Sequence, residues 1–311
     1  MLAAAIVIAV LLVFVLLPCV TVTLMLFRRK SIPDFDELKD PPGGWYTPYI
    51  QGILEDIAFM RQIDSREVSV RADDGVELKA AWYGSASNKT AILLHGFCAT
   101  PLNNFSVIGK TLYERGWNLL LVWQRGHNKS GGAYTTLGVK ERGDLFKWIE
   151  KAGELAPGSK LLLWGVSMGG ATVAYASDEL PTDTVRAMVV DCCYCSPADQ
   201  MLTGLRGKLC RPLMPLIRLL SRLFYGIDIK SRTTEPLSRT EVPAAFVTGL
   251  ADTTVTPERF MCNYEACASN KLLVCVPDAP HALAFAAADE ETRDKLFSFI
   301  DGAFEAQSKQ L

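Results

Sequence analysis

The chain has 311 residues and a formal net charge of −2, so it lacks the basic excess that a nucleic-acid-binding surface needs. Hydrophobic residues make up 49% of the chain and charged residues 21%, which is typical of a globular protein and excludes a largely disordered one. The nine cysteines are odd in number and lack the regular spacing of a disulfide framework, so we expect reduced, largely buried thiols.

No charged side chain occurs from Met1 to Phe27. A run of this length can cross a hydrocarbon core, which takes about 20 residues. A cleaved signal peptide is the alternative, but no basic residue precedes the run, and the run is longer than such a segment. Arg28, Arg29 and Lys30 follow directly, and positive charge favours the cytoplasmic side. We therefore expect a single-pass transmembrane helix over residues 1–27, with the rest of the chain in the cytoplasm.

Residues 28–50 form a polar stretch that contains Pro41, Pro42, Gly43 and Gly44. This composition predicts a semi-extended juxtamembrane linker. The globular domain is then expected over residues 51–311.

Short apolar segments dominate this domain. Residues 67–83 predict two strands joined at Asp73-Asp74-Gly75, which is a hairpin signal. Further apolar runs alternate with helix-like stretches at residues 90–94, 117–123, 160–164, 185–190, 244–248 and 272–276. Strands that are apolar on both faces are typical of parallel strands between two helix layers. The pattern predicts an α/β fold with a mostly parallel central sheet and helices on both faces.

The alternation stops between the runs at 185–190 and 244–248, and we expect a helical lid insertion at about residues 195–240. No acidic residue occurs from Met201 to Tyr225, where apolar residues alternate with Arg206, Lys208, Arg211, Arg218 and Arg222. Two interpretations stay open. A basic amphipathic helix could bind a membrane surface, or a cap helix could pack its leucines over the active site.

The pattern Gly-x-Ser-x-Gly, with Ser167 at its centre, stands between a predicted strand and a predicted helix. This is the context of a nucleophile elbow, in which the turn lifts the hydroxyl clear of the sheet; a plain Gly-rich turn is the alternative. A serine hydroxyl needs a base, and His281 is the one histidine downstream of Ser167, as the order Ser, acid, His requires. Asp252, after the run 244–248, is the candidate acid, and Asp191 is the alternative.

A tetrahedral intermediate also needs donors for its oxyanion. We expect the backbone N–H of Met168, the residue after the nucleophile, and that of Phe97, after the run 90–94. His95 is expected to orient this loop. The chemistry needs no metal or organic cofactor.

These motifs resemble those of the α/β-hydrolase superfamily, in the same order along residues 68–304. The motifs are His95-Gly96-Phe97, Arg125-Gly126-His127, the elbow around Ser167, Gly249 with Asp252, and Ala279-Pro280-His281. Within the superfamily the chain resembles bacterial membrane-anchored hydrolases of the serine aminopeptidase-like, monoacylglycerol-lipase-like (lysophospholipase-like) group. The resemblance implies the α/β-hydrolase fold and a Ser-His-Asp triad. Three residues depart from the group's pattern: Trp123 stands where an Asp is usual, Asn128 where a second Gly is usual, and Val166 in the elbow where His, Glu or Tyr is common.

We therefore expect a serine hydrolase that cleaves carboxylic esters through an acyl-enzyme, with lipid-like or acyl esters favoured. A serine aminopeptidase-type amide hydrolase shares the scaffold, and an inactive hydrolase-fold binding protein is the third hypothesis. The expected partners are a small acyl ester or lipid substrate and a membrane bilayer, contacted through residues 1–27 and by the basic lid.

Overall fold

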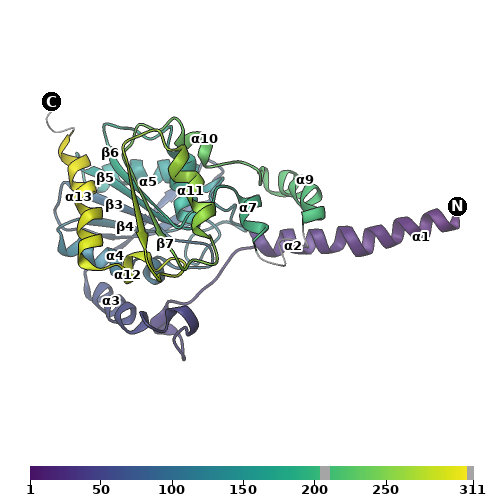
Figure 1. Cartoon of the computed structure of the whole chain (residues 1–311), viewed down its shortest axis with the longest axis horizontal. Coiled ribbons are helices and arrows are strands. Elements are labelled where there is room, and N and C mark those ends of the chain that lie inside the picture. Colours follow the sequence, from purple (N-terminus) through teal and green to yellow (C-terminus); the bar gives the residue numbers. More distant parts are fainter. Residues whose placement is uncertain (204–210, 307–311) are drawn as a thin grey trace.

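The computed structural model describes residues 1–203 and 211–306. Among them is an eight-stranded sheet in the order β1-β2-β4-β3-β5-β6-β7-β8 (Figure 1). Strand β2 is antiparallel to both of its neighbours, and the other pairs are parallel. The strands are β1 (Arg66–Arg71), β2 (Glu77–Tyr83), β3 (Lys89–Leu94), β4 (Asn118–Trp123), β5 (Lys160–Val166), β6 (Val185–Asp191), β7 (Ala244–Gly249) and β8 (Lys271–Val276).

Each apolar run identified in the sequence forms one of these strands, and the mostly parallel sheet is confirmed. Strands β3, β5 and β6 carry no exposed residue, because each lies between two other strands and under helices on both faces.

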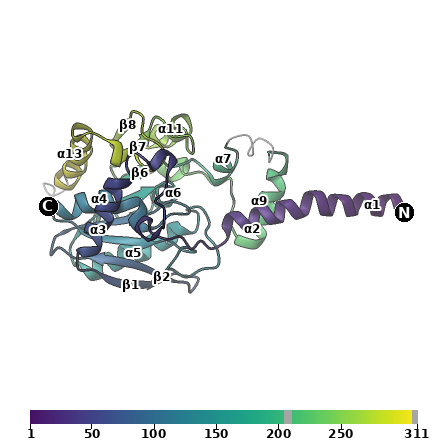
Figure 2. The same cartoon turned by 90° about the horizontal axis from the view of Figure 1, so that it is seen from below.

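Helices cover the two faces of the sheet (Figure 2). One layer contains α3 (Ile50–Gln62), α4 (Pro101–Glu114), α12 (Ala284–Ala287) and α13 (Glu290–Ala306). The other contains α5 (Glu141–Leu155), α6 (Met168–Ala176), α10 (Thr234–Leu237) and α11 (Pro257–Ala266). The apolar core is thus split by the sheet, with Trp164 buried on the α4 side and Trp148 on the α5 side.

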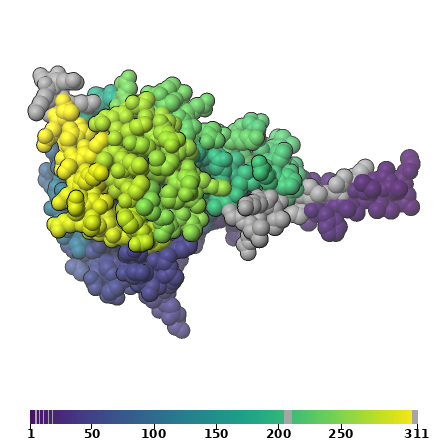
Figure 3. Space-filling model, in the orientation of Figure 1, coloured from purple at the N-terminus to yellow at the C-terminus, as the bar shows by residue number. Residues whose placement is uncertain are grey.

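The N-terminal helices project from the domain (Figures 1 and 3). They are α1 (Leu2–Leu11), the π-helical η1 (Leu12–Leu16) and α2 (Leu17–Phe27), and the two α-helices have 10 and 11 residues. In the part of the chain that the structure describes, no helix is both long enough and apolar enough to cross a membrane. The transmembrane helix expected over residues 1–27 is therefore not found.

The linker is packed against the domain, in contrast to the expected spacer. It forms two short 3₁₀ turns, η2 (Phe35–Glu37) and η3 (Gly44–Tyr46). Aromatic side chains of this segment, Phe35 and Tyr46, pack with Tyr49 around Ile53, Ile57 and Leu283. This small apolar cluster ties the linker to α3 and to the loop before α12.

The insertion between β6 and β7 contains α7 (Pro197–Met201), η4 (Arg211–Leu213), α9 (Met214–Tyr225) and α10. Helix α9 lies beside α2 (Figure 1), where the rings of Phe27 and Tyr225 are 4.6 Å apart. Two of its predicted basic residues, Arg218 and Arg222, both pair with Asp228, at 2.6 and 2.5 Å. The predicted Arg206 and Lys208 lie outside the described residues.

The expectation that all thiols are reduced is wrong for two cysteines. Cys195, in the loop after β6, and Cys262, on α11, form a disulfide with a Cα–Cα distance of 6.7 Å. Their separation of 67 residues hides this proximity from the sequence, because only the packing of α11 against the sheet brings them together. Of the other cysteines that the structure describes, Cys19, Cys192, Cys193 and Cys267 are buried, whereas Cys98 and Cys275 are exposed.

Candidate active site

Ser167 lies at the turn between β5 and α6 with a φ of +53°, in a region that non-glycine residues rarely occupy. The turn packs closely on the end of β3. A Cβ atom at Gly169 would lie only 1.7 Å from the carbonyl oxygen of Leu94, so only glycine fits there. The sharp turn places Ser167 at the carboxyl end of β5, where chemistry in α/β sheets is usually found.

The structure brings the side chains of Ser167, His281 and Asp252 together. His281 Nε2 lies 3.1 Å from Ser167 Oγ, and His281 Nδ1 lies 2.6 Å from Asp252 Oδ2. The other carboxylate oxygen, Oδ1, accepts the backbone N–H groups of Thr254 and Val255 at 2.8 and 2.9 Å. Since the Asp252 side chain is fully buried, its position is fixed. A carboxylate held in this way keeps the proton on Nδ1 and leaves Nε2 free to accept one.

Close contact between two loops makes this arrangement possible. Gly249 ends β7, and a Cβ atom at this position would lie 2.1 Å from the carbonyl oxygen of Ala279. The N–H of Ala251, two residues further along the chain, also donates to the carbonyl oxygen of Ala279 at 3.1 Å. The loop that carries Asp252 can therefore lie directly against the loop that carries His281.

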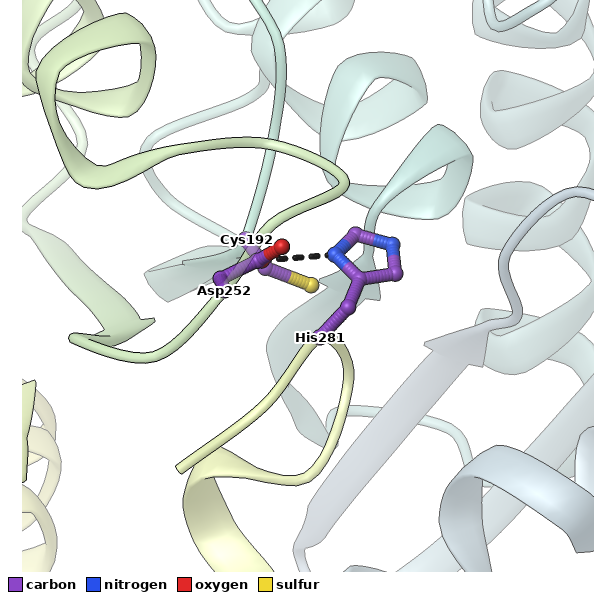
Figure 4. A group of neighbouring side chains, drawn as sticks. All are labelled: Cys192, Asp252 and His281. Atoms are coloured by element: carbon purple, nitrogen blue, oxygen red, sulfur yellow. Dashed lines mark hydrogen bonds and ion pairs between the residues drawn. The ribbon is translucent and has the colours of Figure 1, made fainter. Parts of the chain in front are cut away.

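Two buried groups at the end of β6, Asp191 and Cys192, adjoin these side chains. Cys192, Asp252 and His281 point toward one another (Figure 4), with their potential ligand atoms within 4.8 Å. Burial raises the pKa of Asp191 to about 7 and that of the Cys192 thiol well above its ordinary value. Asp191 Oδ1 has no hydrogen-bond partner among the described residues. Asp252, rather than the alternative acid Asp191, is thus the residue bonded to the imidazole.

Cys192, Asp252 and His281 offer one donor atom each to a metal ion. However, His281 Nδ1 and Asp252 Oδ2 are 2.6 Å apart and bonded to each other, whereas two ligand atoms of one zinc ion stand about 3 Å apart or more. The buried thiol also retains its proton, which makes it a poor ligand. The arrangement fits a hydrogen-bonded acid and base better than a metal centre. Cys192 was not among the predicted site residues, because nothing in the sequence marks it beyond its place after Asp191.

The loop after β3 passes directly beside the serine. A Cβ atom at Gly96 would lie 3.4 Å from Ser167 Cβ. The two residues predicted to donate N–H groups to an oxyanion, Phe97 and Met168, follow Gly96 and Ser167 in the chain. Because Gly96 and Ser167 are in contact, the residues that carry the two predicted N–H donors follow directly from neighbouring positions in the structure.

Hydrogen bonds on both sides fix Gly96. Its N–H donates to Asn104 Oδ1 at 2.8 Å. The N–H of Gln124 donates to His95 Nε2 at 3.1 Å, which leaves Nδ1 to donate to the carbonyl oxygen of Gly96 at 2.8 Å. Burial lowers the pKa of His95 to about 3, so the ring is neutral and can both accept and donate. His95 therefore orients the loop, and Asn104, which the sequence analysis missed, holds it from the other side.

The sheet, the elbow serine after β5, and an Asp and a His after β7 and β8 define an α/β-hydrolase. A sequence model of the family described as serine aminopeptidase, S33, matches residues 85–241, half of the chain. The chain therefore belongs to this family.

The chain is also similar to other proteins and to solved structures. YqkD of Bacillus subtilis (strain 168), described as an uncharacterized protein, is 25% identical over 219 residues, which are 68% of this chain and 71% of that protein. The esterase Pf2001 of Pyrococcus furiosus has a TM-score of 0.65 at 24% identity, covering 88% of this chain and 98% of that chain. Est1E of Butyrivibrio proteoclasticus, solved with ferulic acid, has a TM-score of 0.57 at 19% identity, covering 76% and 98%. At these identities the structural likeness shows the fold.

Proposed function

We propose that the protein is a serine hydrolase that cleaves carboxylic esters through an acyl-enzyme. The observation that carries the proposal is the continuous line of hydrogen bonds from Asp252 through His281 to Ser167. His281 Nε2 takes the hydroxyl proton as Ser167 Oγ attacks the ester carbonyl carbon, while Asp252 stabilises the imidazolium. The N–H groups of Phe97 and Met168 hold the oxyanion. The leaving alcohol takes the proton from His281, which then activates water to release the acid.

An ester is favoured over an amino-terminal amide by the charges at the site. Recognition of a free amino group calls for an accessible carboxylate. The two carboxylates beside the serine, Asp191 and Asp252, are 1% and 3% exposed and cannot reach such a group. Pf2001, named as an esterase, shares the fold. The aminopeptidase-type amide hydrolase is the second candidate, favoured by the family's description.

We further propose that the protein works at a lipid surface. The N-terminal helices carry exposed apolar side chains, among them Leu2, Ile6, Phe14, Leu17, Leu24 and Met25. Helix α9, packed beside α2, adds Leu219, Leu223 and Phe224, each more than half exposed. Exposed apolar side chains grouped on adjacent elements are typical of membrane contact. A lipid-like acyl ester is the substrate class that this location favours.

A fluorophosphonate probe, which reacts with activated serines, tests the catalytic proposal. Folded wild-type protein should be labelled, and Ser167→Ala should abolish labelling. His281→Ala and Asp252→Asn should each lower kcat for a short acyl ester about 10³- to 10⁴-fold. Asp191→Asn is the matched control, since it alters an equally buried carboxylate that does not touch the imidazole. An unlabelled wild type would refute the proposal, and equal losses in the two Asn variants would refute the assignment of the acid.

The substrate class is tested with nitrophenyl esters of increasing acyl length beside aminoacyl nitroanilides. We expect kcat/KM for the best ester to exceed that for the best amide by more than about 10²-fold, which corresponds to about 2.7 kcal/mol. A preference for the amides would support the aminopeptidase-type alternative.

A further inference from the structure

Residues 29–37, which we call the strap, run from the end of α2 to η2 along the domain. Asn128 is hydrogen-bonded to the strap near its N-terminal end. Its Oδ1 accepts the N–H of Ile32 at 3.1 Å, and its Nδ2 donates to the carbonyl oxygen of the same residue. Its backbone N–H donates to the carbonyl oxygen of Lys30 at 2.9 Å. Asn128 is the residue that replaces the glycine usual in this motif, so the departure from the pattern has a structural role.

Asn103, in the first turn of α4, is hydrogen-bonded in the same way to the C-terminal end of the strap. Its Oδ1 accepts the N–H of Phe35 at 2.8 Å, and its Nδ2 donates to the carbonyl oxygen of Pro33 at 3.1 Å. Asn103 is 5% exposed, so water competes little for these bonds. Each of the two amides therefore binds a backbone donor and a backbone acceptor of the strap.

The loop of residues 96–100, which carries the proposed oxyanion donor Phe97, contacts the strap at Lys30 and at Asp34, one residue in each clamped stretch. Within the described parts of the chain, Phe97, Cys98 and Ala99 form no backbone hydrogen bond. The strap supplies two other restraints. Lys30 Nζ lies 4.8 Å from the centre of the Phe97 ring, and the Thr100 hydroxyl donates to the Asp34 carboxylate.

We propose that the strap holds this loop in its working position, so that the segment between the N-terminal helices and the domain is a positioning part of the active site. The inference rests on the proposed function, because it concerns the oxyanion donor of that reaction. A donor contributes only when it is aimed at the place where the oxyanion forms. Loosening the strap should therefore lower kcat and leave KM nearly unchanged, since the ground-state ester makes little use of the donor.

The substitution Asn128→Gly in the full chain tests the inference. Glycine tolerates the φ of +37° at this position and removes only the side-chain clamp. We expect kcat for a soluble ester and the rate of fluorophosphonate labelling to fall roughly tenfold, less than the 10²- to 10³-fold that complete loss of a donor costs. KM should change less than about twofold. Lys30→Met removes the cation over Phe97. Like Asn128→Gly, it should lower the rate of fluorophosphonate labelling.

Lys129→Ala is the matched control, because Lys129 neighbours Asn128 but pairs with Glu67 instead of the strap. It should leave the labelling rate unchanged, and melting curves should show that all variants fold. If wild-type protein is not labelled, the proposed function itself fails. If wild-type protein is labelled and Asn128→Gly is labelled equally fast, or if Lys129→Ala loses as much, the role of the strap is refuted and the proposed function stands.

Discussion

Ser167 occupies a backbone conformation that typically costs about 1–3 kcal/mol, and its neighbours hold it there. Its N–H donates to the carbonyl oxygen of Asp191 at 2.8 Å, and its own carbonyl oxygen accepts the N–H of Ala171 at 2.9 Å. Strain of this kind persists only where the surroundings impose it, and it tends to occur at functional residues. The strained residue is the one whose hydroxyl contacts His281 Nε2, which supports its role as the nucleophile.

Asp191 should make the stability of the protein depend on pH. Burial raises the pKa of its carboxyl from the ordinary 3.8 to about 7, so the folded chain binds this proton more tightly than the unfolded chain. Its contribution to stability is full below pH 4 or so and is lost as the pH rises to about 7. Asn at this position cannot ionise. Relative to wild type, the free energy of unfolding of Asp191→Asn should rise across this window, by up to about 4 kcal/mol at about 1.4 kcal/mol per pKa unit.

Urea denaturation of both proteins at a series of pH values measures this difference. The gap should widen up to about pH 7 and stay constant above it. Parallel curves from pH 4 to pH 8 would show that the carboxyl is ionised in the folded protein.

At the scale of secondary-structure elements, a buried ion pair joins the loop after β4 to α5. Arg125 Nε and Nη2 each donate to one oxygen of Asp144 at 2.6 Å, and Nη1 donates to Asp74 at 2.7 Å. The Arg125 and Asp144 side chains are 5% and 8% exposed, whereas Asp74 is 42% exposed. Burial raises the pKa of Asp144 to about 6, against the opposing effect of Arg125.

Removal of one partner of this pair should be costly. We expect Asp144→Ala to lower the free energy of unfolding by about 3–5 kcal/mol, because the guanidinium then stays buried with only an exposed partner. Asp74→Ala removes that exposed partner and should cost less than about 1 kcal/mol. The double variant Arg125→Met/Asp144→Leu should recover most of the loss. Denaturation midpoints with unchanged slopes measure these effects, and equal costs for the two Ala variants would contradict the argument from burial.

Elements whose structure follows from local pattern were predictable from the sequence. The strands β3 to β8 are short apolar runs, and Gly-x-Ser-x-Gly after one of them identified the turn at Ser167. The chain order of Asp252 and His281 was enough to select them, because the fold fixes which loops meet.

Features that depend on packing between distant segments were not predictable. The linker composition predicts a spacer, but Asn103 and Asn128 bind the linker through hydrogen bonds to its backbone. Bonds of this kind do not depend on the side chains of the linker, so its sequence gives no sign of them. The same applies to Cys192 and to the bond between Cys195 and Cys262, which meet only after β6, β7 and α11 are in place. At the scale of the whole molecule, the N-terminal helices, the strap and the active-site loop form one connected path.

The end of this path that faces away from the active site should bind lipid mainly through apolar contact. Leu219, Leu223 and Phe224 of α9 are more than half exposed, whereas Arg218 and Arg222 share Asp228 as an ion-pair partner. Part of the positive charge of α9 is thus neutralised within the helix region. We therefore expect anionic headgroups to contribute less to binding than the exposed apolar side chains do.

Flotation of the full chain with neutral and with anionic vesicles measures the two contributions. Substitution of Leu219, Leu223 and Phe224 by Ser should weaken binding to neutral vesicles by at least about tenfold, because each buried side chain of this size contributes about 1.5–3 kcal/mol. The matched control is Leu250→Ser, since Leu250 is a leucine with 51% exposure that lies in the loop after β7. Its binding should equal that of wild type. Binding that survives the triple substitution but disappears at high salt would instead assign the contact to the arginines.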